Sequence, residues 1–106
     1  MSDIDLDLIQ KILSEDKREY SVYALINYTK KEIYFGISKQ LNIRYFQHMF
    51  NTVDSTSHWN FGNDDTERQV IRENLTKKEA SDLAHKLEKT TFNGFEDFKI
   101  IQTGGA

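Results

Sequence analysis

Apolar residues recur with helical spacing at the start of the chain and then give way to two runs that are typical of β-strands. Residues 1–19 place isoleucine and leucine three or four positions apart behind an acidic first turn, which predicts an amphipathic N-terminal helix. Residues 20–28 and 32–37 are rich in β-branched and aromatic side chains, and the polar segment between them suits a turn. The two runs therefore predict a β-hairpin.

The middle of the chain adds a second helix and a third strand. In residues 39–50, apolar and aromatic positions return with a helical period, and Ser38 is the expected N-cap. Residues 51–65 are polar and predict a loop. Residues 67–73 alternate weakly between apolar and polar side chains, which predicts a third strand.

The C-terminal third opens with a clear helix start. Thr76, followed three residues later by Glu79, is a capping-box signature, and small and apolar positions continue the helix to about Lys89. Asn-Gly at residues 93–94 predicts a turn, and residues 98–101 predict a short last strand or an extended tail. This order of elements predicts an α+β fold with an antiparallel sheet.

Composition excludes several function classes. A chain of 106 residues suffices for one domain. Cysteine is absent, which excludes disulfides, thiolate chemistry and zinc sites built on Cys. No apolar run approaches the ~18 residues of a membrane span, and the acidic N-terminus is unlike a secretory signal. We therefore expect a cytoplasmic protein that does not enter a membrane.

The charge distribution directs attention to one region. Lys and Arg number 14 against 17 Asp and Glu, a net charge of −3, which argues against a general nucleic-acid binder. Residues 26–50 are the exception, since Glu32 is their one acidic residue. Their basic residues are Lys30, Lys31, Lys39 and Arg44. An anionic ligand is therefore expected to find its cations in this stretch.

Two pairs of residues in this region could share chemistry. Tyr23 and Tyr34 fall on the same face of the hairpin by strand parity, although strands also favour tyrosine for structural reasons. Arg44 and His48 lie one helical turn apart. A shared anion such as a phosphate would explain that pair, and so would an ordinary solvated helix face.

Three more residues keep two interpretations each. Glu88 lies at the edge of the buried face of the last helix, where it could hold Mg²⁺ in a cleft or form an ordinary exposed ion pair. His58 could line a site from its loop or be merely exposed. His85 lies mid-helix beside lysine and is expected at the surface.

Together these residues resemble the GIY-YIG nuclease family, over residues 20–105. The matching elements are Ser21-Val22-Tyr23, Tyr34-Phe35-Gly36, Ser38, Leu41, Arg44, His48 and Ala84-x-x-Leu87-Glu88. The chain departs from the family pattern where Ser21 replaces the first glycine and Phe35 the middle isoleucine. Gln102 stands where the family often carries an asparagine.

The resemblance implies a fold and an activity. The fold is a three-stranded antiparallel sheet flanked by helices over residues 20–106. The helix predicted from the apolar spacing of residues 1–19 is an addition to that fold. The activity is hydrolysis of DNA phosphodiester bonds by an endonuclease that depends on Mg²⁺ or Mn²⁺. DNA is the implied partner.

The resemblance also assigns roles to residues. Glu88 binds the metal ion and Arg44 contacts phosphate. Tyr23 and Tyr34 flank the attacking water, with His48 as an additional polar group. We expect these five side chains to converge on one concave face. Further substrate contacts are expected from Lys30, Lys31, Gly36, Ser38, Lys39, His58 and Gln102.

Two other interpretations stay open. A non-catalytic domain of the same fold could bind nucleic acid or a protein partner, and an unrelated small interaction module could match by chance. RNA also remains open as the substrate. One domain of this length has no room for a separate DNA-binding domain, so a targeting protein or self-association would then direct the enzyme to its substrate.

Overall fold

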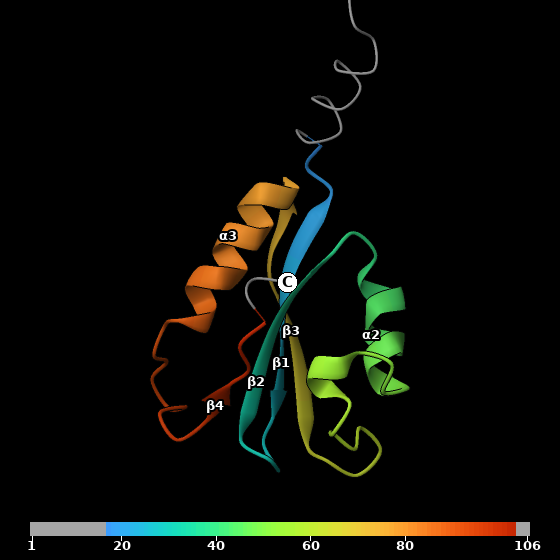
Figure 1. The fold of residues 1–106 in the computed structure, drawn as a ribbon, viewed down its shortest axis with the longest axis vertical. Helices are drawn as coiled ribbons and strands as arrows, with labels where there is room; N and C mark the ends of the chain where they lie inside the picture. Colours follow the sequence, from blue (N-terminus) through green and yellow to red (C-terminus); the bar gives the residue numbers. More distant parts are fainter. Residues whose placement is uncertain (1–16, 104–106) are drawn as a thin grey trace, which may run out of the picture.

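The computed structural model describes residues 17–103 (Figure 1). The N-terminal helix predicted over residues 1–19 falls on residues outside this range, except for residues 17–19, which form no helix. The described elements are β1 (Tyr20–Asn27), β2 (Glu32–Ser38), α2 (Leu41–Met49), the short 3₁₀ helix η1 (Asp54–Thr56), β3 (Thr66–Leu75), α3 (Lys77–Glu88) and β4 (Lys99–Ile100). The fold is therefore α+β, with each predicted strand and both later helices present.

The sheet has four strands rather than the three expected, in the order β3-β1-β2-β4. The β1 strand pairs antiparallel with both β2 and β3, whereas β4 pairs parallel with β2. The fourth strand forms because the backbone amides of Lys99 and Ile101 donate to the carbonyls of Lys31 and Ile33, at 2.9 and 2.8 Å. These bonds satisfy part of the edge that β2 would otherwise expose.

Different elements cover the two faces of the sheet. One face carries the buried cluster Tyr23, Leu25, Tyr34, Tyr45 and Trp59, which joins the hairpin to α2 and the loop after it. The opposite face buries Val22 against Ala80 and Ala84 of α3, and aromatic side chains from residues 92–98 complete its cover. Figure 1 shows α2 and α3 on either side of the strands.

The two helices begin in different ways. The Thr76 hydroxyl accepts from the Glu79 amide at 3.1 Å and the Glu79 carboxylate accepts from the Thr76 amide at 3.0 Å, so the predicted capping box is confirmed. The predicted Ser38 cap of α2 is wrong. Gln40 is the N-cap residue, and the Ser38 hydroxyl accepts from the Gln40 amide at 2.9 Å, before the helix begins.

None of the helices within residues 17–103 has both the length and the apolar character needed to cross a membrane.

Candidate active site

The hairpin positions two buried tyrosines and a glycine. Tyr23 and Tyr34 share one face of the sheet, as predicted, with ring centroids 6.0 Å apart. Gly36 lies directly opposite Tyr23 across the β1–β2 pair. A Cβ atom at Gly36 would lie 2.6 Å from Cζ and the hydroxyl of Tyr23 and 2.7 Å from Cε1 of Tyr34. Glycine is required at this position because the tyrosine rings occupy the space of a side chain.

The α2 helix brings His48 against these rings. His48 is 1% exposed, and its ring centroid lies 4.9 Å from that of Tyr34. Its Nε2 is 2.7 Å from the Tyr23 hydroxyl, and its Nδ1 is 2.7 Å from the Thr56 hydroxyl. A neutral imidazole has one donor and one acceptor nitrogen, so one of these hydroxyls donates to the ring and the other accepts from it. Tyr23, His48 and Thr56 thus form a continuous chain of buried hydrogen bonds.

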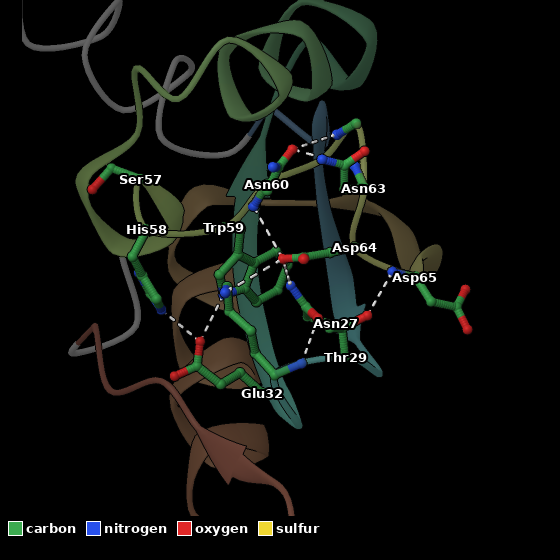
Figure 2. A network of polar contacts seen from close by, with 12 residues as sticks. Asn27, Thr29, Glu32, Ser57, His58, Trp59, Asn60, Asn63, Asp64 and Asp65 are labelled. Atoms are coloured by element: carbon green, nitrogen blue, oxygen red, sulfur yellow. Dashed lines mark hydrogen bonds and ion pairs between the residues drawn. The ribbon is translucent and has the colours of Figure 1, made fainter.

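The loop that supplies Thr56 is tied to the hairpin by polar contacts, which Figure 2 shows. The Glu32 carboxylate accepts from Trp59 Nε1 at 2.7 Å and contacts His58 Nε2 at 2.5 Å. The Asp64 carboxylate accepts from Asn27 Nδ2 at 2.9 Å. Trp59 also packs against the tyrosine cluster. The network fixes the loop behind His48, and it engages His58, which contacts Glu32 and not the tyrosine pair.

The environment of this cluster shifts two pKa values in directions that matter for proton transfer. Burial, and then the nearby Arg44 cation, lower the pKa of His48 to about 4, so the imidazole is neutral at neutral pH. Burial, followed by the neighbouring Tyr34, raises the pKa of Tyr23 above its ordinary value, and the opposing effect of Arg44 is smaller. Tyr23 therefore keeps its proton, while a His48 nitrogen keeps an available lone pair.

Arg44 extends the cluster toward solvent. It lies one turn before His48, is half-buried, and its guanidinium interacts with the hydroxyls of both Tyr23 and Tyr34. Its Nη1 donates to Gln47 Oε1 at 2.9 Å. Arg44 also lines an open pocket of about 370 Å³ together with Ser38, Lys39, Gln40, Ile43 and Gln47. The pocket gives an anion access to a cation that is anchored beside two phenols.

The structure does not place Glu88 in the cluster that it was predicted to share with Tyr23, Tyr34, Arg44 and His48. Glu88 ends α3, which packs on the sheet face opposite the tyrosines. Its side chain is buried, because the C-terminal segment folds back over it. The Thr103 amide donates to Glu88 Oε1 at 3.1 Å and the Thr103 hydroxyl donates to Oε2 at 2.5 Å. Ile101, two residues before Thr103, is still paired with β2 and packs on the tyrosine cluster. Because Thr103 follows so closely, its bonds hold Glu88 near the β2 edge of the sheet.

The structure thus brings four of the five predicted catalytic residues into one cluster and holds the fifth near the edge of the same strand pair. A comparison with protein-family models matches residues 19–100 to the GIY-YIG catalytic domain. The chain belongs to the GIY-YIG family. Comparisons with curated proteins and with solved structures gave no significant match. GIY-YIG domains are typically endonucleases, so membership indicates a nuclease-type activity in general.

The C-terminal residues of this GIY-YIG domain differ from the family pattern in a way that the structure explains. The Gln102 side chain donates to the backbone carbonyl of Glu88 at 3.0 Å and is itself exposed. It is Thr103 that binds the Glu88 carboxylate. Thr56 and Thr103 are therefore the two residues at this site that the sequence did not indicate. Nothing in their spacing links them to His48 or Glu88, since both contacts depend on how loops fold back.

The lysines expected at the GIY-YIG site are dispersed, which corrects the predicted basic cluster. Lys30 and Lys31 lie at the hairpin turn, at the end of the seven-residue β2 strand remote from Arg44, a span of about 20 Å. Each pairs with an acid, Lys30 with Asp64 at 3.8 Å and Lys31 with Asp97 at 2.8 Å. Lys39 does line the Arg44 pocket, and its ammonium lies 3.5 Å from the Glu19 carboxylate.

A divalent cation fits the donor atoms at Glu88. Among residues 17–103, no group of three or more His, Asp or Glu side chains could enclose a metal ion. Mg²⁺ does not require such a cage, since it keeps several waters and is commonly held by one or two carboxylates and substrate phosphates. A carboxylate has about four lone-pair sites, of which Thr103 engages two at Glu88. Within the part of the chain that the structure describes, the other oxygen lone pairs of Glu88 have the donor chemistry that such a cation prefers.

Proposed function

We propose that this GIY-YIG protein is a divalent-metal-dependent endonuclease that hydrolyses DNA phosphodiester bonds. The observation that carries the proposal is the hydrogen bond between the Tyr23 hydroxyl and His48 Nε2, 2.7 Å long and fully buried. A purely structural core gains little from placing two phenols, an imidazole and a guanidinium together. Together these groups can hold a phosphate and move a proton.

Substrate binding is assigned to the pocket beside Arg44. The planar guanidinium can donate two parallel hydrogen bonds to non-bridging phosphate oxygens. Ser38 and Lys39 line the same pocket and supply further donors. Arg44 links this pocket to the hydroxyls of Tyr23 and Tyr34, which do not line it and are 0% and 2% exposed. The mechanism therefore requires a bound substrate to bring a water molecule to one of these hydroxyls.

Proton transfer is assigned to Tyr23 and His48 acting together. Because the pKa of Tyr23 is raised, a resting phenolate is not available to act as the base. Tyr23 acts as a relay: its oxygen takes a proton from the attacking water as its own proton passes to His48 Nε2. The water oxygen forms a bond to phosphorus, the bond to the leaving oxygen breaks, and that oxygen takes a proton from solvent. His48 Nδ1–H donates to Thr56 throughout, which fixes the ring.

A phosphate on Arg44 also favours this relay. The low pKa of His48 has two causes, burial and the Arg44 cation. An anion bound to the guanidinium offsets the second cause, so the imidazole becomes a better proton acceptor when substrate is present. A bound Mg²⁺ or Mn²⁺, held by Glu88, would neutralise charge that develops on the phosphoryl and leaving oxygens.

The proposal is tested by nicking of a supercoiled plasmid in Mg²⁺ or Mn²⁺. The informative variant is Glu88→Gln, because a buried carboxamide keeps the shape of the side chain and can still accept from the Thr103 amide. Glu73→Gln on the exposed β3 strand is the matched control. We expect metal-dependent nicking by the wild type and by Glu73→Gln, and loss of nicking in Glu88→Gln.

Two results would count against the proposal. Full activity of Glu88→Gln would place metal binding elsewhere in the chain. A folded wild-type protein that cleaves no nucleic acid with either metal would favour a non-catalytic GIY-YIG domain that binds nucleic acid or a protein partner.

A further inference from the structure

The outward face of α2 carries large apolar side chains that belong to none of the core clusters within residues 17–103. Phe46 is 58% exposed and Phe50 is 73% exposed, one turn apart on the side of the helix away from the buried Tyr45 and His48. Their rings are nearly parallel, with centroids 6.4 Å apart and an interplanar angle of 15°. These two exposed and nearly parallel rings are here called the Phe46–Phe50 surface.

The Phe46–Phe50 surface adjoins the phosphate pocket. Ile43 lies one turn before both Gln47 and Phe46, is itself half-exposed, and lines the pocket with Arg44. A nucleic-acid strand that places one phosphate at Arg44 can therefore place a neighbouring base along the outer side of the same helix.

The charge around this surface suits a polyanion. Residues 33–53 contain Lys39 and Arg44 but no Asp or Glu, in a chain that has 17 acidic residues. This stretch includes the whole of α2, whereas beside the pocket the Glu19 carboxylate lies 3.5 Å from the Lys39 ammonium. An anionic strand meets no like charge on this helix.

A second copy of the chain is a weaker explanation for the exposed rings. The apolar area that α2 exposes is on the order of 500 Å², whereas each partner in a stable complex buries about 800 Å². The helix has nine residues, and its flanks at Asn42 and Gln47 are polar. An aromatic surface of this area beside a cationic pocket therefore suits one nucleic-acid strand better than a protein interface.

We propose that Phe46 and Phe50 stack against unpaired bases of a DNA strand whose phosphate occupies the Arg44 pocket. The preferred substrate then contains single-stranded DNA, because the base faces of an intact duplex are already stacked on one another. Base–aromatic stacking contributes about 1–3 kcal/mol per base, which is enough to decide between single-stranded and duplex substrates. The location of the scissile phosphate rests on the proposed nuclease function, whereas the binding preference does not.

The test compares binding of a short fluorescein-labelled DNA strand and of its blunt duplex, by fluorescence anisotropy with EDTA present to prevent cleavage. The variant is Phe46→Leu/Phe50→Leu, which keeps apolar side chains but removes both rings. Ile71→Ala, an exposed apolar position on β3, is the control.

We expect the wild type to bind the single strand more tightly than the duplex, and the double variant to lose about tenfold or more of the single-strand affinity. Duplex binding and the Ile71→Ala protein are expected to be unchanged. A 2-aminopurine base in the strand is expected to be quenched by the wild type and by Ile71→Ala, and not by the Phe46→Leu/Phe50→Leu protein.

Three results would overturn the inference. In the first, the double variant binds the single strand as tightly as the wild type does. In the second, the double variant loses affinity equally for the single strand and for the duplex. Alternatively, sedimentation velocity would show a wild-type dimer that the double variant abolishes, which would assign the surface to a second copy. Plasmid nicking separates this inference from the nuclease proposal: nicking without single-strand preference refutes only the stacking surface, and single-strand preference without cleavage refutes only the catalytic role.

Discussion

Gly36 gives a test of the site that needs no substrate. A Gly36→Ala substitution places Cβ 2.6 Å from two atoms of Tyr23 and 2.7 Å from an atom of Tyr34. Carbon atoms in proteins pack at about 3.5–4.0 Å, so each contact overlaps by about 1 Å. Neither ring is a loose end that can swing away. Tyr23 is fixed by its hydrogen bond to His48 and by edge contact with Tyr45, at a centroid distance of 5.5 Å.

The magnitude follows from that confinement. Overpacking a filled core by one methyl group destabilises proteins by about 1–3 kcal/mol, and a displaced Tyr23 would also leave His48 Nε2 without its partner. We therefore expect Gly36→Ala to lose about 2–4 kcal/mol of unfolding free energy. For a domain of this size that corresponds to a fall in Tm of roughly 10–20 °C.

The assay is thermal and urea unfolding followed by circular dichroism, with Gly62→Ala as the control. The nearest neighbour of a Cβ at Gly62 is 3.5 Å away, an ordinary contact in an exposed loop. Gly62→Ala is expected to unfold like the wild type. If Gly36→Ala were as stable as Gly62→Ala, the tyrosine rings would not be held as the structure shows, and the argument for a preorganised site would fail.

Two further predictions concern the His48 hydrogen bonds. The pKa of His48 is about 4 in the folded protein and about 6.5 in the unfolded chain, so between these values only the unfolded state binds the additional proton. The free energy of unfolding is therefore highest above pH 6.5. It falls by roughly 2–3 kcal/mol as the pH drops toward 4. Urea unfolding between pH 7 and 4.5 measures this loss, and a His48→Gln protein with the same slope would contradict it. Thr56→Val removes a buried hydroxyl and is expected to lower stability by about 1–3 kcal/mol and to mix the His48 tautomers seen by nitrogen NMR, whereas Thr56→Ser restores a single tautomer. Unchanged tautomers in Thr56→Val would remove Thr56 from the site.

Local patterns predicted much of this site because local geometry determines it. Strand alternation placed Tyr23 and Tyr34 on one face, and helical spacing placed Arg44 beside His48. The Thr76 capping box is likewise complete within four residues. These relations depend on the backbone repeat alone and do not require knowledge of the tertiary fold.

Contacts made by returning segments could not be predicted in the same way. Thr56 reaches His48 only because its loop is fastened to the hairpin, and the burial of Glu88 depends on Thr103, fifteen residues later. The lysines illustrate the opposite error. Lys30 and Lys31 are close to Arg44 in the sequence but lie at the far end of a strand, so counting charge along the chain overestimated the charge at the site.

The central claim is that Tyr23 relays a proton to His48 during phosphodiester hydrolysis. The most direct test is single-turnover cleavage by Tyr23→Phe beside the wild type, with DNA affinity measured on the same preparations. Removing one hydroxyl leaves the aromatic packing in place, so we predict DNA binding within about twofold of the wild type and a cleavage rate lower by about 10²–10⁴. A Tyr23→Phe protein that cleaves at the wild-type rate would contradict the account.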